Sequence, residues 1–103
     1  MIELYNGDCL EVMDQLISKG IKVDMILTDP PYGTTACKWD SVIPFDEMWK
    51  RLNILIKDNG AIILFGSEPF SSQLRCSNLK TISMIGYGIR HWQVMAFLQR
   101  NNL

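Results

Sequence analysis

The sequence has no excess of positive charge. Its 10 Lys and Arg residues stand against 11 Asp and Glu residues, for a formal net charge of −1 at pH 7. Proteins that bind nucleic acid unaided usually present a basic patch, because neutralised phosphates supply most of the non-specific affinity. The chain therefore either has no nucleic-acid partner or leaves the contact with the phosphate backbone to another part of a larger assembly.

Cysteine, histidine and long hydrophobic runs are also scarce. The three cysteines, Cys9, Cys37 and Cys76, are widely spaced and match no metal-ligand pattern, so we expect reduced thiols and no metal site. The single histidine, His91, has no partner motif, so we expect a surface or packing residue rather than a catalytic one. No apolar run approaches the length of a membrane span, and no basic region precedes an apolar N-terminal stretch. These absences predict a soluble, cytoplasmic chain without a membrane partner.

Hydrophobic periodicity divides the chain into alternating strands and helices. Asp8 and Pro44 stand where helices commonly begin, and Gly20 and Gly60 stand where they commonly end. The apolar stripe that contains Trp49 is expected to belong to the core. The pattern predicts strands over residues 2–5, 23–28 and 61–65, and helices over residues 8–20, 44–60 and from 67 onward. This alternation is typical of a doubly wound, mostly parallel α/β sheet.

Three turns follow the predicted strands and carry most of the candidate chemistry. In doubly wound sheets, ligands bind beyond the carboxyl ends of the strands, so we expect the three turns to share one edge. They are Gly7-Asp8-Cys9, Asp29-Pro30-Pro31-Tyr32 and Gly66-Ser67-Glu68-Pro69-Phe70.

The second of these turns resembles the motif with which DNA amino-methyltransferases hold their target base. An exocyclic amine is a poor nucleophile, because its lone pair is delocalised into the ring. Two acceptors on its hydrogens, the Asp29 carboxylate and the Pro30 carbonyl, would draw the nitrogen toward a tetrahedral geometry, and the fixed φ of proline would orient that carbonyl. Tyr32 would stack on the base, an interaction worth about 1–3 kcal/mol. The alternative is an ordinary strand end with a Pro30-Pro31 turn, capped by Asp29.

Other segments extend the resemblance over about residues 1–80 and point to the phage- and prophage-type members of the family. By this resemblance, Asp8 would bind the adenine amino group of S-adenosylmethionine, with the Cys9 backbone N–H beside it. Asp8 is equally placed to cap a helix, and the two roles are compatible. An Asp at the head of the tetrapeptide implies adenine N6 as the target, since cytosine-N4 members more often carry Ser there. The further segments are Lys38-Trp39-Asp40, Ile43-Pro44-Phe45-Asp46 and Leu64-Phe65-Gly66-Ser67.

The glycine-rich donor motif of the family is missing. Phe65-Gly66-Ser67 resembles its start, but Glu68 or Pro69 stands where the second glycine is needed for close backbone approach. The resemblance implies the permuted order, in which the catalytic motif comes first and a C-terminal half supplies the recognition region and the donor motif. We therefore assign residues 1–80 to the N-terminal half of a methyltransferase domain and residues 81–103 to a divergent tail that a frame shift would explain. We expect the chain alone to be inactive.

The sequence is also compatible with two other functions. The chain could be a non-catalytic protein, either a remnant or one subunit of a split methyltransferase whose sheet is completed by a separately encoded half. It could also methylate RNA or protein, although such enzymes usually carry Asn-Pro-Pro, and the leading Asp29 argues against that function.

Overall fold

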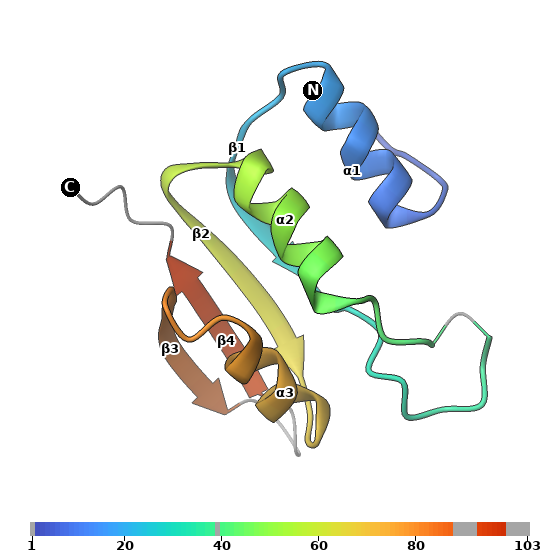
Figure 1. Cartoon of the computed structure of the whole chain (residues 1–103), viewed down its shortest axis with the longest axis vertical. Helices are drawn as coiled ribbons and strands as arrows, with labels where there is room; N and C mark the ends of the chain where they lie inside the picture. Colours follow the sequence, from blue (N-terminus) through green and yellow to red (C-terminus); the bar gives the residue numbers. More distant parts are fainter. Residues whose placement is uncertain (1, 39, 88–92, 99–103) are drawn as a thin grey trace.

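The computed structural model describes residues 2–38, 40–87 and 93–98, so Trp39 and His91 of the sequence analysis lie outside the described residues. Three helices accompany a four-stranded sheet with the strand order β1-β2-β4-β3 (Figure 1). β1 and β2 are parallel, whereas β4 is antiparallel to both β2 and β3. The described elements are α1 (Cys9–Ser18), β1 (Val23–Thr28), α2 (Phe45–Leu55), β2 (Ile56–Gly66), α3 (Phe70–Ser77), β3 (Ile82–Tyr87) and β4 (Gln93–Leu98).

The start and end of α1 follow from local chemistry, as predicted. The Asp8 carboxylate accepts hydrogen bonds from the N–H groups of Leu10 (2.9 Å) and Glu11 (3.3 Å), which have no partner within the helix. After the C-cap Lys19, Gly20 takes a φ of 72°, a left-handed conformation that a glycine adopts without steric cost. The predicted cap and stop are confirmed.

The junction between α2 and β2 differs from the prediction. The helix ends at Leu55 and the strand begins at Ile56, five residues before the predicted start at Ala61. Residues 57–60 look like a polar turn, yet they form an irregular stretch of the strand. Val23 pairs with Ile56 and Met25 pairs with Ala61, so the extra residues of β2 bulge out of the ladder. Asn59 accommodates the bulge with a φ of 65°.

The first predicted strand does not form. Residues 2–5 belong to no strand, and Ile2 and Leu4 remain 87% and 92% exposed. A strand needs a neighbour for its backbone hydrogen bonds, and none of the described strands lies beside this segment.

The predicted α/β class is confirmed, and the sheet is mixed: β1 and β2 pair in parallel as expected, whereas β3 and β4 form an antiparallel pair that the sequence did not predict. β4 enters the middle of the sheet, between β2 and β3, and its Met95 and Phe97 are fully buried in the common core. The proposed boundary between residues 80 and 81 falls between α3 and β3, and the division of the chain there stays a prediction.

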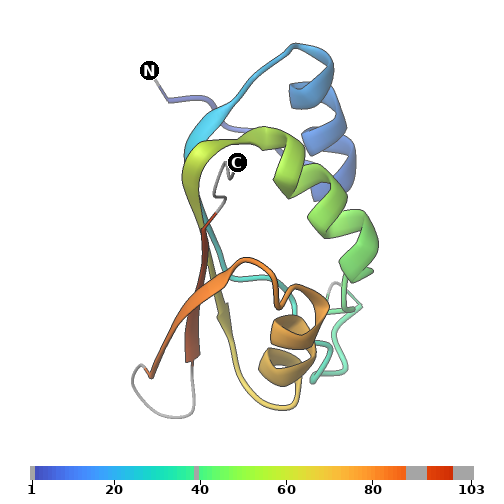
Figure 2. The same cartoon turned by 60° about the vertical axis from the view of Figure 1, so that its left-hand side comes forward.

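The core lies on one face of the sheet, where all three helices pack (Figure 2). Ile62 and Leu64 of β2 point toward the helices and are buried, as are their β4 neighbours Met95 and Phe97. Trp49 joins this core, as predicted, and its ring contacts Phe97 edge-on at 4.7 Å between centroids.

On the other face of the sheet, the regularly paired positions of β1, β2 and β4, from the Met25–Ala61 pair onward, carry only apolar side chains. The strand registers place eight side chains side by side there, and none of them is buried. Among the described residues, no helix packs against this face (Figure 2). In an α/β sheet both faces are normally covered by helices. This exposed face is as apolar as a face that is normally covered. We call it the open face; it consists of Met25, Leu27, Ala61, Ile63, Phe65, Val94, Ala96 and Leu98.

Candidate functional site

The tetrapeptide Asp29-Pro30-Pro31-Tyr32 begins where β1 ends and lines a cavity of about 330 Å³. Pro30 is buried beneath the rim, whereas the side chain of Asp29 is exposed. The volume lies at the lower end of the range of about 300–1,000 Å³ that is typical of small-molecule pockets. The cavity is lined by Asp29, Pro30, Pro31, Tyr32, Thr34, Thr35 and Asp40.

Asp29 and Tyr32 lie in direct contact at this cavity. The Tyr32 hydroxyl donates a hydrogen bond to the Asp29 Oδ1 atom. Partial burial, followed by this hydrogen bond and by the charge of Asp29, raises the pKa of Tyr32 well above its usual range. The phenol therefore stays protonated at neutral pH and acts as a donor to the carboxylate.

Phe70 supports the Tyr32 ring from behind. The two rings stack with centroids 5.0 Å apart and planes inclined by 28°, and Phe70 itself is 2% exposed. Phe70 opens α3, directly after the exit of β2, so the turns after β1 and β2 meet as expected. We did not assign Phe70 a role from sequence; its place in the third turn was the signal that could have found it.

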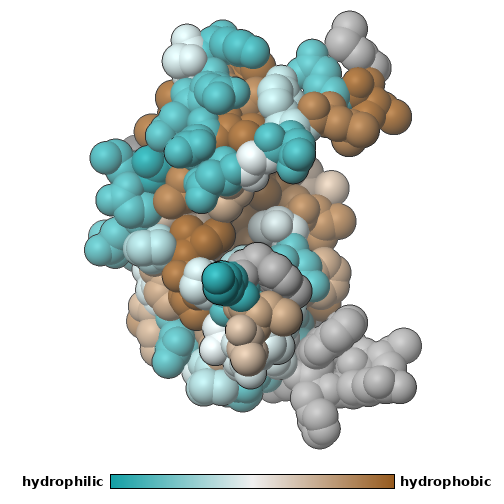
Figure 3. Space-filling view, turned by 90° about the vertical axis from the view of Figure 1, so that its right-hand side faces the viewer, coloured by the Kyte–Doolittle hydropathy of each residue, from teal (hydrophilic) through white to brown (hydrophobic). Residues whose placement is uncertain are grey.

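Cys9 lies beside the tetrapeptide, on a second cavity of about 280 Å³. Burial, and then the neighbouring charge of Asp8, raises the pKa of the Cys9 thiol. This cavity shares Asp29, Pro30 and Pro31 with the first one. Figure 3 looks onto the side of the molecule that carries α1 and shows a hollow bordered by hydrophobic residues. The remaining lining residues are Met13, Ile26, Thr28, Ile43, Met48 and Leu52.

Asp8 lines neither cavity but stands next to Cys9 at the first turn of α1. One of its carboxylate oxygens caps the helix. Its other oxygen makes no hydrogen bond within the described parts of the chain. The helix-capping role assigned from sequence is thus present, and one oxygen is left over for a further donor.

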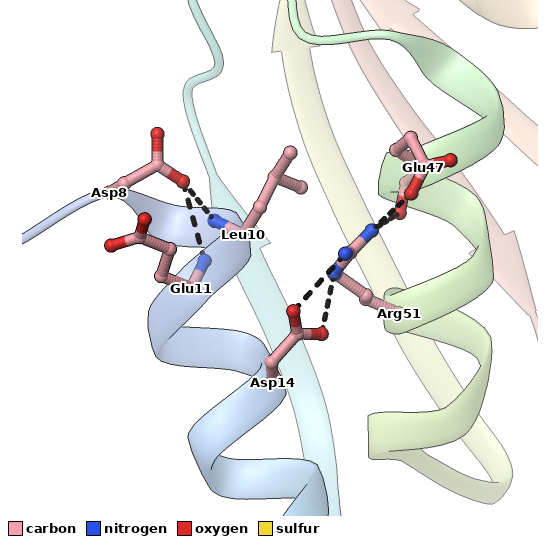
Figure 4. Close-up of polar contacts among 6 residues, drawn as sticks. All are labelled: Asp8, Leu10, Glu11, Asp14, Glu47 and Arg51. Carbon is pink, nitrogen blue, oxygen red and sulfur yellow. Dashed lines mark hydrogen bonds and ion pairs between the residues drawn. The ribbon is translucent and has the colours of Figure 1, made fainter.

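Arg51 holds α1, and with it Asp8 and Cys9, against α2 (Figure 4). Its Nε and Nη2 atoms donate to the two Asp14 carboxylate oxygens at 2.7 and 3.2 Å, and its Nη1 donates to Glu47 at 2.7 Å. The hydrogen bonds from Arg51 lower the pKa of both carboxyl groups. Since α1 has no buried residue, this bidentate contact is a principal link between the two helices.

Asp40 closes the loop that follows the tetrapeptide. Asp40 is only 8% exposed, and its carboxylate accepts three hydrogen bonds in place of water. The donors are the Gly33 N–H (3.0 Å) and the N–H (2.8 Å) and hydroxyl (2.6 Å) of Thr35. The bond from the Thr35 hydroxyl, followed by that from Gly33, lowers the pKa of Asp40. In the sequence Asp40 counted only as part of the family resemblance; a carboxylate a few residues after a Gly-Thr-Thr turn is the signal for such a closure.

No group of three or more His, Cys, Asp or Glu side chains among the described residues could hold a metal ion. No helix in that part of the chain is both long and apolar enough to cross a membrane.

Comparison with solved structures assigns the fold. The chain superposes on the crystal structure of M1.HpyAVI in complex with SAM with a TM-score of 0.72 at 19% identity, covering 98% of this chain and 55% of that one. The crystal structure of M1.HpyAVI alone gives a TM-score of 0.67 at 19% identity, covering 97% and 56%. No family model and no curated protein sequence matches. The chain therefore has a methyltransferase-like α/β fold and spans about half the length of these two structures.

Proposed function

We propose that the chain forms the base-holding half of a DNA methyltransferase that transfers a methyl group from S-adenosylmethionine to adenine N6. The observation that carries this proposal is the shared cavity of Asp29, Pro30 and Tyr32 at the end of a parallel strand. That is where ligands bind in α/β sheets. The methyltransferase-like fold supports the same reaction class.

The residues present suit an amine held for alkylation. The exposed Asp29 carboxylate accepts one amine hydrogen, and the Pro30 carbonyl accepts the other. The Tyr32 ring, backed by Phe70, offers a flat surface for a flipped base. Base stacking of about 1–3 kcal/mol per aromatic offsets much of the few kcal/mol that base flipping costs.

The second cavity suits the adenosyl end of a sulfonium donor. Its lining is mainly apolar, as a purine ring requires, and it includes Cys9, the neighbour of Asp8 in the chain. M1.HpyAVI was crystallised with SAM. S-adenosylmethionine supplies the methyl group when bound; Asp8 and Cys9 would hold it beside Asp29 and Pro30, which both cavities share.

The decisive experiment is transfer of tritiated methyl groups from S-adenosylmethionine to unmethylated DNA, with a C-terminal methyltransferase half carrying the glycine-rich motif added in trans. We expect no transfer by the chain alone, transfer to adenine N6 by the mixture, and loss of that transfer in Asp29→Ala. Asp24→Ala, an exposed β1 carboxylate on the same strand, serves as the control. Transfer only to cytosine, or equal transfer by Asp29→Ala, would refute the proposal.

A second candidate, a non-catalytic subunit or remnant, is favoured by the open face. β1 is an edge strand whose Met25 and Leu27 are 55% and 56% exposed, and the two M1.HpyAVI structures contain a further portion without counterpart here. We propose that this face binds the complementary half of a methyltransferase domain. Sedimentation of the mixture distinguishes the outcomes: a one-to-one complex supports a split enzyme, whereas self-association of this chain that persists in the mixture, or no complex, contradicts it.

A further inference from the structure

The cavity at Asp29 has a second wall, formed by the loop after the tetrapeptide. Thr34, Thr35 and Asp40 line the cavity together with Asp29 and Tyr32. This segment belongs to no helix or strand, so its position does not follow from the sheet or the helices. Something else must hold it in place for the cavity to keep its shape.

The Asp40 carboxylate supplies that hold. Both of its oxygens are used: Oδ1 accepts from Gly33, and Oδ2 accepts from the backbone and the hydroxyl of Thr35. A nearly buried carboxylate is stable only when donors replace its water, and here the three donors come from the two residues that flank Thr34. The carboxylate thus fixes the backbone on either side of Thr34.

The backbone at Gly33 fits this arrangement. Gly33 has a φ of 73°, and a Cβ atom there would lie 2.7 Å from Cγ2 of Val42. The chain therefore turns sharply beside Asp40, directly after Tyr32. This turn connects Tyr32, the proposed stacking residue, to Thr34 in the second wall of the cavity.

The hydroxyl groups of the two threonines differ in their availability. The Thr35 hydroxyl donates to Asp40 and accepts from the Cys37 N–H. Thr34 is one of the residues that line the cavity; it is exposed, and its hydroxyl makes no hydrogen bond within the described residues. A free hydroxyl can both donate and accept, which matches the mixed pattern of the edge of adenine.

We propose that Asp40 is a positioning residue that holds the loop as the second wall of the base cavity, so that the Thr34 hydroxyl contacts the edge of the bound purine. This inference rests on the proposed function and adds to it a residue that determines specificity and a residue that positions it.

The test is an NMR titration of the chain with 2′-deoxyadenosine, combined with amide hydrogen exchange at Gly33 and Thr35. Asp40→Ala is expected to lose the protection of both amides and to weaken nucleoside binding about tenfold or more, since the wall is no longer held. Asp40→Asn keeps one acceptor oxygen, so its amide protection and its affinity for the nucleoside should lie between those of the unchanged chain and those of Asp40→Ala. Thr34→Val should keep the protection and weaken binding by about threefold to tenfold, the cost of one hydrogen bond. The control is Asp46→Ala, an exposed carboxylate in the first turn of α2.

The outcomes separate the inference from the function on which it rests. If the unchanged chain binds deoxyadenosine and both Asp40→Ala and Thr34→Val bind it equally well, the inference is overturned and the proposed function stands. If the unchanged chain does not bind the nucleoside while the amide protection still depends on Asp40, the base-holding function fails and the inference fails with it. Thr34→Val keeps the test valid should Asp40→Ala not fold.

Discussion

The hydroxyl of Tyr32 occupies an oxygen of Asp29, the acceptor that the proposed chemistry assigns to the base. The donor of Tyr32 and an acceptor of Asp29 are thus paired with one another across a single turn of chain. The second oxygen of Asp29, Oδ2, makes no hydrogen bond within the described residues and can accept from an incoming amine, while the Tyr32 ring stays in place against Phe70. The contact orients both groups before the base arrives, and the phenol competes with the amine for Oδ1 alone.

Substitution at Tyr32 separates the two roles of this side chain. Tyr32→Phe removes the competing donor and keeps the ring, so binding of 2′-deoxyadenosine should stay unchanged or become tighter. Tyr32→Ala removes the stacking surface and should weaken binding by about 1–3 kcal/mol. Isothermal titration or NMR shifts measure both. Equal weakening by Phe and Ala would show that the hydroxyl, rather than the ring, holds the base.

Arg51→Met should loosen α1 from α2. The change keeps most of the apolar stem but removes the donors to Asp14 and Glu47, so hydrogen exchange should accelerate in α1 and the Tm should fall. Lys50→Met, at an exposed neighbouring position that makes no ion pair among the described residues, is the control. Unchanged exchange in α1 would mean that apolar contacts alone dock the helix.

The contribution of Arg51 should depend on pH. The pKa values of Asp14 and Glu47 are lowered in the folded chain, so their stabilising effect is present above the unfolded values, about 4 to 4.5, and is lost as pH falls through the lowered values. The Tm difference between the unchanged chain and Arg51→Met should therefore shrink as the pH is reduced from 7 toward 3. A difference that stays constant across this range would contradict the ion-pair explanation.

Two glycines with positive φ provide a matched pair. Gly20→Ala places a Cβ in open space and should cost about 1–2 kcal/mol, the penalty of a left-handed residue. Gly33→Ala carries the same penalty and adds a contact of 2.7 Å with Val42, so its free energy of unfolding should fall further. Urea denaturation of both variants checks the order. If the two losses are equal, Val42 moves aside without cost.

The open face should make the isolated chain bind hydrophobic dyes and self-associate. Leu27→Lys places a charge on the β1 edge of this face and is expected to reduce binding of a hydrophobic dye and to suppress self-association, with little change in Tm. Ile54→Lys, at a 42% exposed position on α2, is the control and should leave dye binding nearly unchanged. The same Leu27→Lys change should abolish the complex with a complementary half-domain.

Local chemistry accounts for the elements that were predicted well. The cap at Asp8, the glycine stop at Gly20 and the short apolar stretch of β1 at residues 25–27 depend on residues within a few positions of one another. The same holds for the tetrapeptide, whose four residues share one cavity because they are consecutive at a strand end. Segments whose conformation depends on a distant partner were predicted less well: residues 2–5, the bulge at Asn59 and the antiparallel β4.

What the sequence by itself determined is the order of the elements from α1 to α3, the place of Asp29-Pro30-Pro31-Tyr32 at a strand exit and the family resemblance. Only the tertiary structure decided that Phe70 backs Tyr32, that Asp40 closes the neighbouring loop and that no described helix covers the open face. The physical reason is range: caps and turns are set by neighbours in the chain, whereas ring stacking, strand order and burial depend on segments that meet only after folding.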